Sequence, residues 1–188
     1  MKKSLFVFLL ALCIAVAPMA LAEKTFKAQL DGKDFFSLSV DDSYIIEEYG
    51  EEGAEEDGYI ALGVLQNDDA YVYISTLHDD EYEGFNMFSA SEDEIKEYLD
   101  YIMEDLAEYG AEEVGIYNAE ITVNNQKVKI PFVIVRIADE EGQYYYAETM
   151  TSGYAITIEI SPAEEGAELR DYELEELKRI LDGFMPAA

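Results

Sequence analysis

The feature that most constrains this fold is a run of strand-like segments in the second half of the chain, joined by very short connections. The segments span residues 114–118, 120–123, 127–138, 144–149 and 154–160. A crossover between parallel strands needs about a dozen residues or more, so connections this short require antiparallel neighbours. The last segment alternates isoleucines with smaller or polar residues, which predicts one buried and one wet sheet face, with helices on the buried side.

Two further hairpins precede this run. Residues 25–30 and 35–40 alternate around Asp31-Gly32-Lys33, and Asp-Gly between such segments is a strong hairpin signal. Residues 59–65 and 71–76 flank a polar turn at 66–69 in the same way. The segment between the two hairpins, residues 41–58, is acidic and contains glycines. We expect it to be a flexible loop with a short strand near residues 44–46.

Two amphipathic helices complete the pattern. Ser91 and Glu94 form a capping box, and apolar residues then recur at helical spacing until Gly110, a natural helix stop. A second helix is predicted over 171–182 and ends at Gly183. The sequence therefore predicts the α+β class: an antiparallel β-sheet with two amphipathic helices packed on it, in a single domain over residues 23–188.

The N-terminus carries the pattern of a secretory signal peptide over residues 1–22. A basic start at Lys2 and Lys3 is followed by an apolar stretch and by the small-residue cleavage site Ala20-Leu21-Ala22. We expect cleavage after Ala22 and export, either secreted or periplasmic. An uncleaved membrane anchor is the alternative, although the apolar run is short for a bilayer span.

Cleavage would change the composition of the chain in two ways. The single cysteine, Cys13, lies in the signal peptide, so the mature chain has no disulfide, thiolate ligand or thiol nucleophile. The 12 Lys and Arg fall to 10 against 42 Asp and Glu, which gives a net charge of −32. That charge excludes nucleic acid and anionic lipid partners and favours a cationic one. We expect a monomer with no membrane span after cleavage, which binds an unknown protein or small ligand.

The sequence contains no recognisable catalytic constellation, so we assign no catalytic residue. His78 is the only histidine, and no G-x-S-x-G elbow is present. A zinc site with several His or Cys ligands is excluded by count, and no cofactor motif is found. Paired carboxylates can hydrolyse glycosides, but the chain has no Trp to stack on a sugar.

An acidic loop between residues 77 and 90 is the candidate cation site. Its carboxylates are Asp79, Asp80, Glu81 and Glu83. Calcium is bound by several oxygen ligands, often from one loop, but these residues do not fit the EF-hand pattern. They are either a solvated acidic loop or a low-affinity calcium site.

The same loop holds three large apolar residues, Phe85, Met87 and Phe88. They either plug the core in front of the first helix or form an exposed recognition lip. We favour the core plug.

The order of the elements resembles the small α/β-sandwich domains of the PsbP/Mog type. The segments that carry the resemblance are "FFSLSV", "ITVNNQKVKIPFVIVRI", "QYYYAETM", "YAITIEISP" and the closing "LKRILDGF". In such domains a Pro-Gly turn often follows the opening strand, and this chain has Asp41-Asp42-Ser43 instead. The resemblance implies a non-catalytic accessory or binding domain, and it transfers no site residue.

These observations lead to one expected function and two alternatives. We expect a secreted, strongly acidic, non-catalytic binding or accessory domain whose ligand the sequence does not name. The first alternative is a carboxylate-based hydrolase, which requires two carboxylates facing each other across a groove. The second is a calcium-binding surface protein.

Overall fold

The computed structural model describes residues 23–49, 55–56, 59–123, 126–138 and 142–187. The expected signal peptide, residues 1–22, lies outside the described residues, as does most of the glycine-containing part of the 41–58 segment. Within the described residues, no helix is long and apolar enough to cross a membrane.

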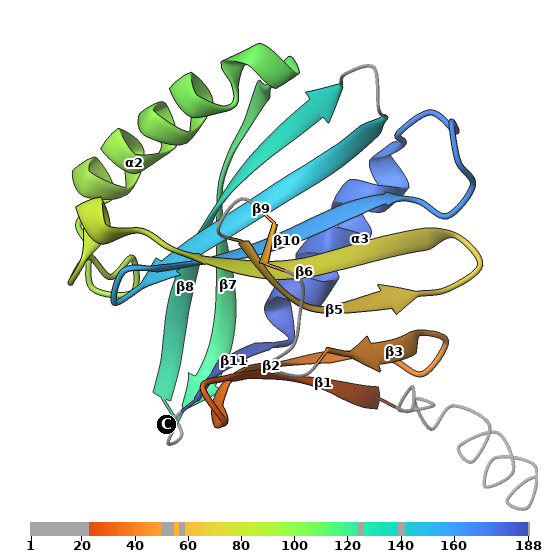
Figure 1. Ribbon diagram of the computed structural model, residues 1–188, viewed down its shortest axis with the longest axis horizontal. Coiled ribbons are helices and arrows are strands. Elements are labelled where there is room, and N and C mark those ends of the chain that lie inside the picture. The colour runs from red at the N-terminus through yellow and green to blue at the C-terminus, as the bar shows by residue number, and fades with distance from the viewer. Residues whose placement is uncertain (1–22, 50–54, 57–58, 124–125, 139–141, 188) are drawn as a thin grey trace, which may run out of the picture.

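Most strands belong to one large antiparallel sheet, which confirms the predicted fold class (Figure 1). Its order is β3-β5-β6-β10-β9-β8-β7, and the two-residue strand β4 lies beside β5. The bounds are β3 Ile45–Glu48, β4 Glu55–Glu56, β5 Tyr59–Gln66, β6 Ala70–His78, β7 Glu112–Val123, β8 Gln126–Ala138, β9 Gln143–Thr151 and β10 Tyr154–Pro162. The two predicted strands 114–118 and 120–123 are one strand, β7, with a bulge between Glu113 and Gly115.

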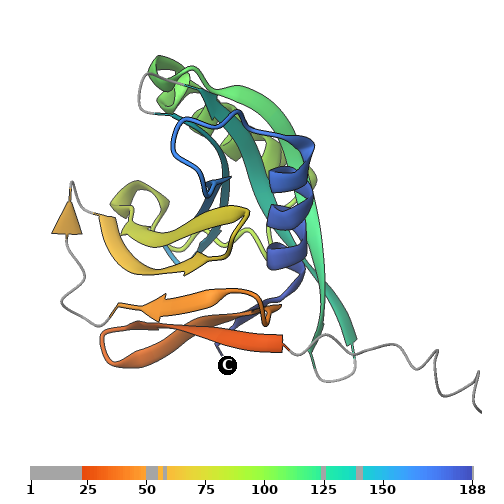
Figure 2. The same ribbon diagram turned by 90° about the vertical axis from the view of Figure 1, so that its right-hand side faces the viewer.

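The N-terminal hairpin forms a second, smaller sheet. Strands β1 (Glu23–Leu30) and β2 (Lys33–Asp41) pair around Asp31 and Gly32, which both have positive φ angles. The predicted hairpin is therefore confirmed. A third strand that the sequence did not predict, β11 (Phe184–Pro186), pairs with β2. Figure 2 shows strands β1 and β2 of this sheet at the bottom of the view, below the blue helix α3.

Two helices are present in the described part of the chain, α2 (Glu92–Asp105) and α3 (Asp171–Asp182). The predicted capping box is confirmed: Glu94 donates its backbone N–H to the Ser91 hydroxyl, and its carboxylate accepts the Ser91 N–H at 2.7 Å. Helix α2 ends earlier than the apolar spacing suggested. A 3-10 turn over Ala107–Tyr109 follows it, and Gly110 then adopts a left-handed conformation.

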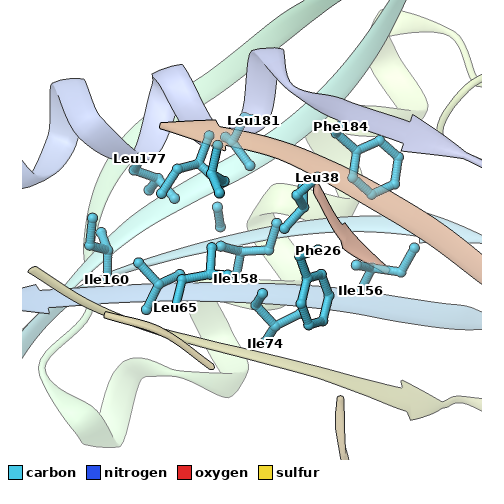
Figure 3. Close-up of a cluster of buried hydrophobic side chains, with 14 of the residues drawn as sticks. Phe26, Leu38, Leu65, Ile74, Ile156, Ile158, Ile160, Leu177, Leu181 and Phe184 are labelled. Carbon is cyan, nitrogen blue, oxygen red and sulfur yellow. The ribbon is translucent and has the colours of Figure 1, made fainter. Parts of the chain in front are cut away.

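The two helices lie on opposite faces of the large sheet (Figure 1). Helix α2 packs on β8, β9 and β10 in one hydrophobic cluster. Helix α3 lies in the other cluster, between the large sheet and the small one. In Figure 3, Leu177 and Leu181 of α3 meet Ile158 of β10 and Leu38 of β2.

The expectation of one wet face on the last strand is wrong. Ala155 and Thr157 are buried on the face opposite Ile156 and Ile158, because α2 and its flanking segment cover that side. The small side chain of Ala155 and the hydroxyl of Thr157 are typical of a solvent-facing position, but both residues lie beneath a helix.

Candidate functional site: tyrosine rows along β10

A polar strip bordered by tyrosines runs along β10 on the α2 side of the large sheet. Its residues are Thr157, Glu159 and Ser161, which alternate with the buried isoleucines of the other face. Ser161 is paired with Tyr71 of β6, and Glu159 is paired with Tyr73 of β6 and Tyr146 of β9. Tyr144 lies two residues before Tyr146, so it leaves β9 on the same face. We call these sets the outer row (Tyr71, Ser161, Tyr144) and the inner row (Tyr73, Glu159, Tyr146).

The two rows differ in burial. In the outer row, Tyr71 is 37% exposed, and Ser161 and Tyr144 are half-buried. In the inner row, Glu159 is half-buried and Tyr146 is buried. The strip thus leads from solvent at the outer row toward the core beneath α2.

A hollow of about 510 Å³ opens at the outer row. Tyr71, Tyr144 and Ser161 line it, together with Gln143 and the carboxylates Glu164 and Glu165 of the connection between β10 and α3. Its lining contains no basic side chain among the described residues. The hollow therefore combines aromatic surface, amide and hydroxyl groups, and negative charge, and it has the volume of small-molecule sites.

Beyond the inner row lies a buried carboxylate, Glu148. The Tyr98 and Tyr146 hydroxyls both donate to it, and the Thr157 hydroxyl lies 3.5 Å away. Burial raises the pKa of Glu148, while these hydroxyl donors oppose the shift. Tyr98 belongs to α2 and Tyr146 to β9, so the carboxylate joins the helix to the sheet.

Glu159 is the second acid of this region with an altered titration. Burial raises the pKa of Glu159 to about 7. Nearby, burial raises the pKa of Tyr59 to about 12, with further contributions from the charges of Glu148, Asp105 and Glu159. Shifted pKa values grouped in one region are typical of functional sites. However, neither Glu148 nor Glu159 lines any of five well-formed hollows of the described structure.

The solvent side of α2 is a second candidate. We call it the acidic face of α2. Its exposed residues are Glu92, Asp93, Glu94, Glu97, Asp100, Glu104, Asp105 and, in the following turn, Glu108. Lys96 is the single basic residue between 92 and 108. Tyr101 lies among the last of these acids and lines a hollow of about 630 Å³ with Glu104, Asp105 and Glu108.

Two further buried acids, Glu173 and Glu176 of α3, are structural. Arg170 pairs with Glu173 at 2.5 Å, and Arg179 pairs with Glu176 at 2.6 Å. Glu176 also accepts the hydroxyl of Tyr44 at 2.7 Å, which ties the segment after β2 to α3. Sequence reasoning missed these pairs, although opposite charges three residues apart on a helix are a usable signal.

The structure places two of the predicted calcium residues, Asp80 and Glu81, in a short 3-10 turn over Asp80–Tyr82, with Asp79 before it and Glu83 after it. Asp80 and Glu83 are exposed, Asp79 is half-buried, and the side chain of Glu81 lies outside the described part. Asp80 lies 3.2 Å from Nδ1 of His78. Among the described residues, no group of three or more His, Cys, Asp or Glu is arranged to hold a metal ion.

The three residues of the proposed recognition lip pack inward to different degrees. Met87 is buried with α2, and Phe88 is half-buried against both clusters. Phe85 is half-buried, and its ring centroid lies 5.5 Å from that of Tyr98. The three side chains thus anchor the segment before α2 to the core. Phe85 and Phe88 are only partly exposed to solvent.

Comparisons with known proteins give a similarity of fold. No family model matches the sequence, and no curated protein matches it significantly. The solution structure of cyanobacterial PsbP (CyanoP) from Synechocystis sp. matches with 13% identity over 91% of this chain and 96% of that one, at a TM-score of 0.46. A crystal structure from Bacteroides thetaiotaomicron matches with 14% identity over 88% of this chain, at a TM-score of 0.41, and this chain spans about half of that protein (48%). The first match agrees with the resemblance in element order, and neither match bears on function.

Proposed function

We propose that this protein is an exported, strongly acidic, non-catalytic binding domain whose partner is cationic. The observation that carries the proposal is the acidic face of α2. Eight exposed carboxylates between Glu92 and Glu108 are accompanied by one lysine. A surface of this kind attracts and orients a positively charged partner.

The acidic face contains repulsions that oppose the stability of its helix, although Glu92, Asp93 and Glu94 lie in the first turn, where negative charge is stabilising. Asp93 with Glu97, and Asp100 with Glu104, are like charges four residues apart, which destabilise a helix. Glu104 and Asp105 lie in the last turn, where the helix dipole is negative and a basic residue would stabilise it. A cationic partner bound here would relieve both kinds of repulsion.

The absence of a catalytic role is supported by the way the unusual acids are used. Glu148 is engaged by the hydroxyls of Tyr98 and Tyr146 beneath α2. Glu173 and Glu176 are paired with arginines. These acids are held by partners within the fold. Glu176 lines two open hollows, but its carboxylate is paired with Arg179 and accepts the Tyr44 hydroxyl, which favours a binding domain over a carboxylate-based hydrolase. The signal-peptide pattern of residues 1–22 supports export.

Charge reversal on the acidic face tests the proposal. The variant Glu97→Lys, Asp100→Lys, Glu104→Lys should bind fluorescein-labelled octalysine at least about tenfold more weakly than the unmodified mature chain, because three attractive charges become repulsive. The measurement is fluorescence anisotropy at about 0.05 M salt, repeated at about 0.5 M salt, where binding should be lost.

The matched control carries the same change in net charge elsewhere. Asp42, Asp68 and Glu168 are exposed and lie outside α2, and their replacement by lysine should weaken octalysine binding less than about threefold. An equal loss in both variants would assign binding to net charge alone. No binding of octalysine to the unmodified chain at low salt would overturn the proposed function.

A further inference from the structure

We propose that the hollow at the outer tyrosine row binds the head group of a small organic ammonium cation. This site is built by β6, β9 and β10, and it does not depend on the acidic face of α2. Its walls are Tyr71 and Tyr144, and Ser161 lies between them on β10.

The spacing of the strands sets the width of the site. Tyr71 and Tyr144 come from strands on either side of β10, so their backbones are two strand spacings, or roughly 10 Å, apart. Side chains stand nearly perpendicular to a sheet, so the two rings are separated by about the same distance as their backbones. Atoms in contact lie ~3.5–4 Å apart, so the half-thickness of each ring takes about half of that distance from the space between them. The remaining slot of roughly 6 Å fits a methylated ammonium group and places its charge within ~6 Å of both rings, the range of a cation–π contact.

The charges around the hollow select a cation. Glu164 and Glu165 lie at its rim, and its lining holds no basic side chain among the described residues. Arg136 donates to the lining residue Gln143, but its guanidinium is also paired with Glu112 at 2.8 Å. An anionic ligand would therefore meet mainly negative charge here, and the net charge of the mature chain adds to that repulsion.

The aromatic walls select an organic cation over a metal ion. A divalent metal requires several converging oxygen ligands, and the hollow offers two exposed carboxylates at its rim. An alkylated ammonium is weakly hydrated and gains both apolar contact and attraction from tyrosine faces. The volume of about 510 Å³ suits a small molecule rather than a folded partner.

The test is an NMR titration of the mature chain with choline and with 3,3-dimethyl-1-butanol, which has the same shape and no charge. Choline should shift the backbone amides of Gln143 and Ser161 saturably, with a dissociation constant in the millimolar range or tighter. The alcohol should bind at least about tenfold more weakly, since it keeps the apolar contact and loses the cation–π attraction.

Ring substitutions locate the site. Tyr71→Leu and Tyr144→Leu should each weaken choline binding about fivefold or more, whereas Tyr71→Phe and Tyr144→Phe keep the rings and should retain it. Tyr172→Leu, an exposed tyrosine on α3, is the matched control and should leave binding unchanged. The phenylalanine variants also decide the outcome if a leucine variant does not fold.

Several outcomes would overturn the inference. These are equal affinity for choline and the alcohol, shifts that do not saturate, or loss of choline binding in the phenylalanine variants or in Tyr172→Leu. The charge-reversed α2 variant should bind choline normally. Its failure to bind octalysine would then test only the proposed role of the acidic face of α2. Loss of choline binding in Tyr71→Leu would test only the proposed site in the hollow.

Discussion

Glu159 and Glu148 show how differently one residue type behaves across this molecule. The acids of α2 face water, whereas these two lie among tyrosines on the inner side of the sheet. The alternation of β10 predicted which residues share a face with Glu159. It could not predict the burial of Glu159, because the covering groups, Tyr73 and Tyr146, come from two other strands. The hydrogen bonds of Glu148 depend in the same way on Tyr98, which lies 50 residues away in sequence.

The titration of Glu159 makes folding stability depend on pH. Burial raises its pKa from 4.5 to about 7 in the folded state, so between these values the folded chain holds a proton that the unfolded chain has released. The contribution of Glu159 to the free energy of unfolding is therefore fully present below about pH 4.5, and it is lost as the pH rises through about 7. The loss amounts to about 2–3 kcal/mol.

Glu159→Gln should remove that dependence, because glutamine does not ionise. We expect the stability of the variant relative to the unmodified chain to rise by about 2–3 kcal/mol between pH 4.5 and pH 8, measured by urea unfolding. The exposed Glu165→Gln serves as the control and should follow the unmodified chain. Parallel pH profiles for Glu159→Gln and the unmodified chain would show that Glu159 titrates normally.

At the scale of elements, the sequence predicted a helix start or a turn correctly where a few neighbouring residues determine it. Ser91 with Glu94 marked the start of α2, and Asp31 with Gly32 marked the first hairpin. Strand β11 could not be found this way. It has three residues, and its pairing with Leu38 of β2 spans nearly the whole described chain. The placement of the two helices on opposite faces is likewise a matter of long-range packing.

Gly183 joins α3 to β11 and lies against the backbone of β2. A Cβ atom at this position would lie 2.1 Å from the carbonyl oxygen of Ser39, whose N–H donates to the carbonyl of Gly183 at 2.9 Å. Gly183→Ala should therefore destabilise the protein by about 1–3 kcal/mol, because the neighbouring backbone must move. Met185→Ala, a partly exposed residue in β11, should cost less than about 0.5 kcal/mol. Equal urea midpoints for Gly183→Ala and the unmodified chain would show that the junction can relax.

At the scale of the whole molecule, the dominant property is unbalanced charge. The sequence contains 42 acids against 12 Lys and Arg residues, and the ion pairs of α3 and β7–β8 neutralise only a few of the acids. Composition alone gives this excess, and the expectation of a cationic partner rests on it. Which surfaces collect the charge depends on the fold, because α2 turns one side to the sheet and the other to water.

Self-repulsion of this size should make the protein more stable in salt. Raising sodium chloride from about 0.01 M to about 0.2 M should increase the melting temperature by a few degrees, because the Debye length falls from ~30 Å to below ~10 Å. Calcium and magnesium at equal ionic strength should give the same increase. A larger shift with calcium would contradict this expectation and would indicate a selective site, with the loop of Asp79 and Asp80 as its first candidate.

The pairing of β11 with β2 also bears on how the small sheet is completed during folding. The small sheet and the cluster around Phe184 require the last described strand together with one of the first, so the closing contacts have very large sequence separation. During synthesis, β2 must wait for nearly all of the chain before its second neighbour exists, and loop closure of this length slows folding. For the export proposed above, this delay would leave the small sheet incomplete, and the chain easier to thread through a translocation channel, until β11 has been made.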